Sequence, residues 1–221
     1  IEEAVKNGAK TFVIGVGNAG GVMPEEWKSI IINAISSGMN VASGMHSRLS
    51  SFGEIAEAAK RNNVQLHDLR FSDKQFQTGK GVKRSGKRLL TVGTDCSVGK
   101  KYTALAIEKA MQSNQIDASF KATGQTGILI AESGIAIDAI VSDFISGAVE
   151  WLSPDNDDNH WDIIEGQGSL FHPSFAGVSL GLLHGSQPDA FVVCHEPTRT
   201  NMRGVDTPLP SIREVIDQTI Q

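Results

Sequence analysis

The amino-acid sequence predicts an α/β protein whose strands form parallel sheets. Short β-rich runs alternate with amphipathic stretches of helical length along most of the 221 residues. Strands separated by such helices are typical of βαβ units. The stretch LLTVGTDCSVGKKYT, residues 89–103, adds a strand, a glycine loop and a helix in immediate succession. The 40% hydrophobic content and the 23 glycines fit this fold class.

The first half of the chain alternates strand and helix. Pro24 stands near the first turn of the first long helix and Gly38 follows its end, as helix-boundary preferences favour. The predicted elements are a strand at Thr11–Val16, a helix at Pro24–Ser37, a strand at Asn40–Ser43, a helix at Phe52–Asn62 and a strand at Val64–Asp68.

Gly15, Gly17 and Gly20 spell G-x-G-x-x-G after the first strand. A dinucleotide-binding fingerprint requires the helix to open at the third glycine and an acidic residue near the end of the second strand. Here the helix opens later and the second strand has no carboxylate. We therefore interpret the glycines as a turn; nicotinamide binding is the alternative.

A glycine-rich, basic stretch separates the two halves, with the cations Lys80, Lys83, Arg84, Lys87 and Arg88. We predict a domain of residues 1–78, a linker of residues 79–88 and a second domain of residues 89–221. We interpret the linker as a solvated, flexible connection. The alternative is a basic rim beside the glycine loop.

The second half alternates strand and helix again. The predicted elements are a strand at Leu89–Val92, a helix at Lys100–Ser113, a strand at Ala118–Ala122, a helix at Asp138–Leu152, a strand at Trp161–Ile164, a helix at Ser174–His184, a strand at Ala190–Cys194 and a helix at Pro210–Gln218. On the long helix, Asp143, Gly147 and Glu150 share a face that we expect to be solvated or to face another subunit.

The glycine loop predicts phosphate binding, because its N–H groups, the helix N-terminus and a lysine all attract an anion. A chance Gly-Lys pair at a βα turn is the alternative. The common pattern places a hydroxyl after the lysine to hold Mg²⁺, whereas this chain has Lys101 there. The predicted cofactor-binding residues are Gly93, Thr94, Asp95, Cys96, Ser97, Val98, Gly99, Lys100, Lys101 and Thr103.

Asp95 and Glu165 are the carboxylates of interest. Asp95 would repel a phosphate unless it faces away, caps the loop or holds Mg²⁺ or an amine. Glu165 ends a short buried strand and precedes glycines that leave room for a ligand. We predict a functional role for Glu165, with a structural role as the alternative.

Other candidates also follow predicted strands, and ligands collect at the carboxyl ends of parallel strands. Gln125, Thr126 and Gln167 can bind substrate through polar side chains, although residues 123–127 can also be an ordinary turn. His172 and His195, with Glu165, are candidate general bases, and Arg199 can grip a carboxylate or phosphate. No histidine or cysteine spacing matches a metal site that we recognise, so we predict none.

Composition excludes several classes of protein. The net charge of −5 argues against a nucleic-acid-binding surface. The two cysteines, Cys96 and Cys194, indicate a reducing compartment rather than a disulfide scaffold. No apolar run reaches membrane-spanning length and no signal peptide is visible, so we expect a cytoplasmic protein. Because the chain starts inside a helix-like pattern and stops just after a helix-like segment, we expect it to be truncated at one or both ends.

Two resemblances add to this reading. Gly93-Thr94-Asp95-x-x-Val98-Gly99-Lys100 resembles the phosphate loop of dethiobiotin synthetase, which has threonine after the lysine. Most of the chain resembles the D-glutamate N-acetyltransferase-type family, long catalogued as a domain of unknown function. The stretches that carry this resemblance are GTDCSVGK, ATGQTG, EGQGSLFHPS, LLHGSQPDA and CHEPTR, with looser matches at IGVGNAGG and SGMHSRL.

The second resemblance implies a Rossmann-like N-terminal domain followed by a P-loop NTPase-like domain, in a chain truncated at both ends. It also implies transfer of acetyl from acetyl-CoA to the amine of a D-amino acid such as D-glutamate. We expect a homo-oligomer that acts on a small molecule. The alternatives are a synthetase or kinase that uses Mg-ATP and a non-catalytic module that senses a nucleotide or CoA.

Overall fold

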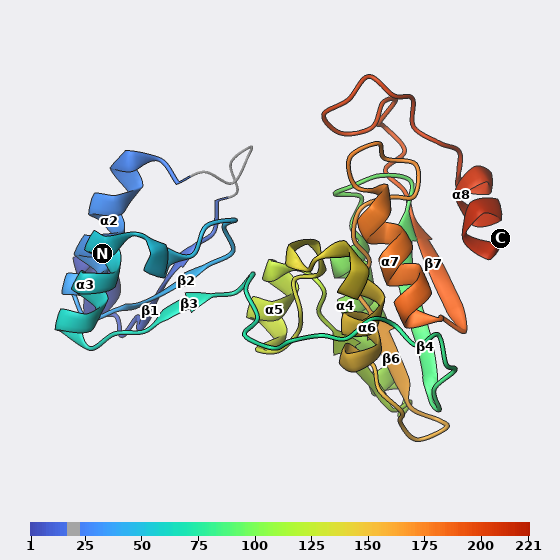
Figure 1. Ribbon diagram of the computed structural model, residues 1–221, viewed down its shortest axis with the longest axis horizontal. Helices are drawn as coiled ribbons and strands as arrows, with labels where there is room; N and C mark the ends of the chain where they lie inside the picture. Colours follow the sequence, from blue (N-terminus) through green and yellow to red (C-terminus); the bar gives the residue numbers. More distant parts are fainter. Residues whose placement is uncertain (17–22) are drawn as a thin grey trace. The chain divides into compact units, whose positions relative to one another are not determined.

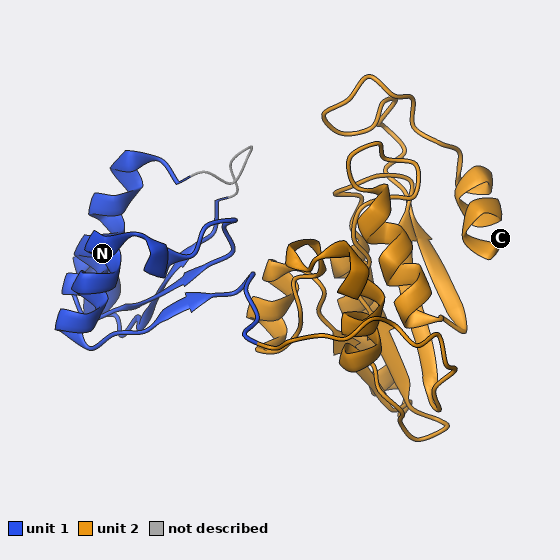
Figure 2. Cartoon of the chain, viewed as in Figure 1, with its two compact units in different colours: residues 1–73 blue, residues 74–221 orange. Residues whose placement is uncertain are grey.

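The computed structural model describes residues 1–16 and 23–221, which form two compact units, residues 1–73 and 74–221 (Figure 2). The glycine motif that begins at Gly15 extends outside the described residues. Both units are α/β with parallel sheets, as predicted. In the described part of the chain, no helix is long and apolar enough to cross a membrane.

The first unit holds a parallel sheet in the order β1-β2-β3. Buried residues of the helices and of the central strand form its core, among them Ile31, Ile35, Val41 and Ile55. The elements are α1 (Glu2–Lys6), β1 (Thr11–Ile14), α2 (Glu25–Ser36), β2 (Asn40–Ser43), the 3-10 turn η2 (Leu49–Ser51), α3 (Gly53–Asn62) and β3 (Leu66–Asp68).

The second unit holds a parallel sheet in the order β5-β6-β4-β7, and Figure 1 labels β6, β4 and β7 of this sheet. Its strands are β4 (Lys87–Gly93), β5 (Ala118–Lys121), β6 (Trp161–Ile164) and β7 (Ala190–Cys194). Its helices and 3-10 turns are α4 (Lys100–Ser113), α5 (Gln125–Ala131), η3 (Ile137–Ala139), η4 (Ser142–Phe144), α6 (Ile145–Leu152), α7 (Ala176–Ser186) and α8 (Ile212–Ile220), which lies beside β7.

Helices cover both faces of the second sheet. Side chains alternate along a strand, so Leu90 and Ile164 are buried in one apolar cluster with residues of α6 and α7. Ile163 is buried in the opposite cluster with Ala104 of α4, and Leu89 packs against it. Buried parallel strands read as short apolar runs, which is why β6 and β7 have the predicted bounds.

The predicted long helix over residues 138–152 is wrong in its first half, because only Ile145–Leu152 is α-helical. Ile140 and Val141 are extended between the two 3-10 turns. The prediction of a solvated face holds for Asp143, which is exposed, but is wrong for Glu150. The Glu150 carboxylate accepts N–H hydrogen bonds from Lys80 (2.9 Å) and Gly81 (2.8 Å), so residues of the basic stretch cover this face.

The basic stretch is neither a free connection nor a rim of the glycine loop. It belongs to the second unit and precedes the amino end of β4, whereas the glycine loop follows the carboxyl end. Arg84 donates to the carbonyl oxygens of Ser153 (2.8 Å) and Gly185 (2.5 Å). Buried Arg88 donates from Nε to Ser153 Oγ (2.8 Å). These cations anchor the start of the central strand.

Candidate functional site

The glycine loop connects the central strand to α4. Ser97 (φ 54°) and Gly99 (φ 99°) adopt left-handed backbone conformations, which turn successive N–H groups toward one concave side. The N–H groups of Ser97, Val98 and Gly99 donate to no acceptor among the described residues. The loop therefore offers N–H donors, together with the N-terminus of the 14-residue helix α4, to an anion.

The lysine of the loop is buried. Lys100 is 6% exposed, and its Nζ donates to the carbonyl oxygen of Asp95 (2.7 Å). Burial lowers its pKa. Two glycines make room for it: a Cβ on Gly93 would lie 3.4 Å from the lysine Nζ, and one on Gly166 would lie 3.1 Å from its Cδ. An anion bound in the loop would favour the protonated form of this lysine and so oppose the effect of burial.

The residues after this lysine differ from those of a metal-binding phosphate loop. The Lys101 ammonium lies 4.5 Å from the centre of the exposed Tyr102 ring. Thr103, the next aliphatic hydroxyl, stands one turn into α4, where its N–H donates to the Gly99 carbonyl (2.9 Å). The loop thus places cations and N–H donors, rather than a hydroxyl, immediately around its lysine.

Asp95 is fully buried and accepts three hydrogen bonds. Cys96 N–H donates to Oδ1 (2.6 Å), and Arg199 Nη1 (2.6 Å) and Arg203 N–H (2.7 Å) donate to Oδ2. Burial opposes ionisation, but these hydrogen bonds outweigh it and lower the pKa of Asp95. Asp95 therefore faces away from the concave side of the loop and ties it to the segment after β7.

Glu165 follows β6, next to the central strand, and is 3% exposed. Its Oε2 accepts the N–H groups of Thr123 (3.0 Å) and Gly124 (3.2 Å), which precede α5. Burial raises the pKa of Glu165, although these hydrogen bonds oppose the rise. A Cβ on Gly127 would lie 2.2 Å from Oε2, so a larger residue here would displace the carboxylate. Glu165 thus holds the 123–127 segment against β6.

The predicted substrate-binding amides and hydroxyl gather at the same edge of the sheet. Residues 123–127 are not simply a turn, because Gln125 opens α5 and Thr126 is exposed in its first turn. Gln167 Nε2 donates to Thr123 Oγ1 (3.2 Å). Ser169 Oγ donates to the Thr94 carbonyl (3.2 Å). These contacts connect the loops that follow β4, β5 and β6.

His195 follows β7 and is half-buried. Its Nδ1 lies 3.1 Å from Oγ1 of Thr94, which is fully buried. No hydrogen bond joins its Nε2 to the described part of the chain. When Nδ1 donates to the threonine, the Nε2 lone pair is available to accept a proton. Among the three candidate bases, His195 thus has an uncommitted nitrogen at the edge of the loop.

His172 is 1% exposed and uses both ring nitrogens. Nδ1 accepts the Ser174 N–H (3.1 Å), so Nε2 carries the proton and donates to the Arg203 carbonyl (3.1 Å). The ring also stacks on Phe175, with 4.6 Å between centroids. In this arrangement His172 supports the backbone of the segment after β7.

The structure gives Arg199 different partners from those expected. Its guanidinium donates to Asp95 and to the Cys96 carbonyl (2.7 Å), so it braces the glycine loop. Arg203, which sequence reasoning missed, contacts Ser97 Oγ through Nη1. Arg203 lies beyond the CHEPTR stretch, and no local pattern marks it.

Asp95, Cys96 and His172 each offer a possible metal ligand, and these atoms lie within 4.8 Å of one another. Two of the three are committed to other contacts, and the third is held in its thiol form. Asp95 accepts three hydrogen bonds, His172 uses both nitrogens, and burial raises the pKa of the Cys96 thiol. Binding a cation here would break the hydrogen bonds to Arg203.

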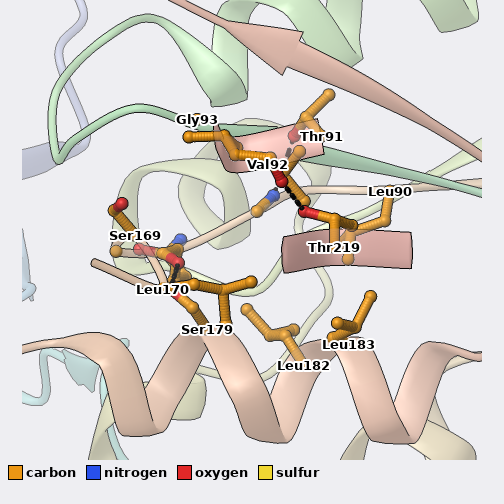
Figure 3. A pocket seen from close by; sticks show the side chains of 14 residues that line it. Leu90, Thr91, Val92, Gly93, Ser169, Leu170, Ser179, Leu182, Leu183 and Thr219 are labelled. Atoms are coloured by element: carbon orange, nitrogen blue, oxygen red, sulfur yellow. Dashed lines mark hydrogen bonds between the residues drawn. The ribbon is translucent and has the colours of Figure 1, made fainter. Parts of the chain in front are cut away.

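A small cavity lies beneath the loops. Ser179, Leu182 and Leu183 of α7 face Leu90 and Thr91 of β4 across it (Figure 3). Its volume of 20 Å³ holds about one water molecule. This volume is too small for a substrate, so the open edge formed by the loops after β4, β5, β6 and β7 is the candidate site.

Comparison with known proteins agrees with this fold. Residues 1–72 match the domain of unknown function DUF1611_N, described as a Rossmann-like domain, and residues 75–221 match DUF1611_C, described as a P-loop domain. A crystal structure of a DUF1611 family protein from Anabaena variabilis superposes with a TM-score of 0.91 at 32% identity, covering 98% of this chain and 64% of that chain.

Two curated relatives carry the name D-glutamate N-acetyltransferase. The relative from Pseudoalteromonas sp. is 60% identical over 219 residues, 99% of this chain, and the relative from Tritonibacter scottomollicae is 53% identical over 218 residues, 98% of this chain. The chain spans 66% of the length of each. These matches confirm the expected resemblance and the two domain types: the chain belongs to the DUF1611 family, with a Rossmann-like first domain and a P-loop second domain.

Proposed function

We propose that the protein transfers acetyl from acetyl-CoA to the amine of a small amino acid such as D-glutamate. The observation that carries this proposal is the glycine loop, with free N–H donors and a buried lysine but no hydroxyl after that lysine. Acetyl-CoA carries a diphosphate, which such a loop can hold without a metal ion. The names of the two curated relatives support the same reaction.

In the proposed reaction, His195 Nε2 takes a proton from the amine, and the amine nitrogen attacks the thioester carbonyl. The C–S bond then breaks, and the CoA thiolate leaves and receives the proton that His195 took from the amine. The N–H groups of Gln167 and Gly168 donate to no described residue, so they are available to the tetrahedral oxyanion. The Gly166 N–H is already bonded to Thr91 Oγ1 (2.9 Å).

The acceptor amino acid needs polar partners at the same edge. Arg199 is committed to the glycine loop, so we assign the substrate carboxylates to Lys101 and to the amides of Gln125 and Gln167. Lys101 contributes positive charge near Glu165, and Gln125 begins the helix that Glu165 holds in place.

The test is an activity assay of the protein in EDTA with acetyl-CoA and D-glutamate, which follows thiol release and detects the N-acetyl product by mass spectrometry. His195→Gln is expected to lower kcat about 10²–10⁴-fold while CoA still binds. His184→Gln, at an exposed position on α7, is the matched control. Unchanged turnover in His195→Gln would remove the histidine from the mechanism.

Glu165 favours a second candidate function, a synthetase or kinase that uses Mg-ATP. A carboxylate at the end of the strand beside a phosphate loop can hold the metal ion that accompanies ATP. This candidate predicts ATP turnover that requires Mg²⁺ and fails in Glu165→Gln. The absence of thiol release together with such turnover would replace the acetyl-transfer proposal.

A further inference from the structure

Arg203 sits at the tip of a short hairpin that follows β7. Asn201 and Pro208 form an antiparallel bridge, and Met202, which is 2% exposed, donates its N–H to the Thr207 carbonyl (2.8 Å). Gly204 has φ 79°, a left-handed conformation that glycine adopts without strain. The hairpin therefore has a defined geometry and presents Arg203 at its turn.

Two buried side chains hold the backbone of this arginine. Its N–H donates to Asp95 Oδ2 (2.7 Å), and its carbonyl accepts from His172 Nε2 (3.1 Å). Asp95 and His172 are 0% and 1% exposed and come from the loops after two other strands. These anchors fix the backbone position from which the exposed side chain extends.

The guanidinium lies against the glycine loop. Nη1 contacts Ser97 Oγ, and the side chain is exposed. Within the described part of the chain, Arg203 has no carboxylate within ion-pair distance, whereas the charge of Arg199 is paired with Asp95 (2.6 Å). The guanidinium of Arg203 is therefore not ion-paired and can donate two hydrogen bonds to an anion. It lies next to the loop whose N–H groups are free.

We propose that Arg203 binds the diphosphate of the ligand held by the glycine loop, with Asp95 and His172 as its positioning residues. The proposal rests on the proposed function in taking CoA as the source of that diphosphate; ATP offers the same chemistry. Arg203 meets the diphosphate from the Ser97 side of the loop, and Lys100 lies buried in the same loop.

The test compares wild type with Arg203→Gln by calorimetric titration with CoA and with ATP. The variant is expected to bind CoA about 10–100-fold more weakly, as loss of a charge-assisted bidentate contact implies. Acetyl-pantetheine is a donor without phosphate, so its kcat and KM should not differ between wild type and Arg203→Gln. Arg213→Gln, which changes an exposed arginine of α8, is the matched control, and thermal melts check folding.

The outcomes separate this inference from the proposed function. If Arg203→Gln binds CoA as tightly as wild type does, the role of Arg203 is refuted and acetyl transfer stands. If wild type binds ATP but not CoA and the variant weakens ATP binding, acetyl transfer fails and the diphosphate contact survives. If Arg203→Gln lost turnover of acetyl-pantetheine as strongly as it lost binding of CoA, the inference would also be overturned, because such a loss would indicate a general structural role.

Discussion

Replacing Asp95 by asparagine tests the polar network that holds the glycine loop. The carboxylate accepts three donors, one on Oδ1 and two on Oδ2. An asparagine has one acceptor oxygen and one NH₂ group. In the better orientation its oxygen still accepts the hydrogen bonds from Arg199 and Arg203. Its NH₂ group then faces the Cys96 N–H, so two donors meet without an acceptor.

The expected cost follows from burial. Breaking a buried ion pair costs about 3–5 kcal/mol. The lower end of this range applies because the Arg199 side chain is 22% exposed, whereas Asp95 is 0% exposed. About 3 kcal/mol lowers the Tm of a domain of this size by about 6–12 °C.

Thermal unfolding followed by circular dichroism at pH 7 and pH 3.5 measures this effect. Hydrogen bonds hold the pKa of Asp95 below its ordinary value, so the ionised carboxylate stabilises the fold above about pH 4 and this contribution is lost as the pH falls further. The difference in Tm between wild type and Asp95→Asn should therefore shrink at pH 3.5.

Asp158→Asn, which changes an exposed aspartate, is the control and should melt like wild type at both pH values. The account would be refuted if Asp95→Asn melted within 2 °C, about 1 kcal/mol or less, of wild type at pH 7. A loss of Tm that stayed equal at both pH values would refute the electrostatic reason for it.

Two further changes probe the glycines and the buried glutamate. In Gly166→Ala the new Cβ would lie 1.6 Å from the Thr91 carbonyl oxygen, so we expect a loss of about 3 kcal/mol or more in unfolding free energy. Gly177→Ala, with nothing within 4 Å, should not destabilise, and equal melts would contradict the close approach. Burial raises the pKa of Glu165, so its ionisation costs stability above about pH 4. In urea melts, Glu165→Gln should therefore gain stability relative to wild type between pH 4.5 and 7.5, and a relative loss would show that the carboxylate stabilises the fold.

Local patterns were enough to predict the parallel sheet and which loops gather at its carboxyl edge. Strands β2, β6 and β7 and helix α4 have the predicted bounds, because buried apolar runs and a glycine loop are features of the sequence itself. The carboxyl ends of parallel strands lie at one edge, so the prediction that the loops near Lys100, Gln125, Glu165 and His195 converge follows from topology alone.

The contacts that the sequence did not reveal join residues far apart along the chain. Glu150 binds the basic stretch across 70 positions, and Asp95 binds Arg203 across 108 positions. The apolar periodicity of a helix also continues through residues 138–144. In the structure, however, Ile137 lies in a 3-10 turn and Ile140 in extended chain, and both pack in the apolar cluster. Local propensity does not specify contacts between residues so far apart in the sequence.

The central claim is that the glycine loop holds the diphosphate of acetyl-CoA without a metal ion. Calorimetric titration of the protein with acetyl-CoA in EDTA, and separately with Mg-ATP, tests it most directly. We expect acetyl-CoA to bind to wild type and to Lys109→Ala, an exposed control on α4, and to lose its binding in Lys100→Ala. Binding of Mg-ATP alone, or acetyl-CoA binding unchanged in Lys100→Ala, would contradict the account.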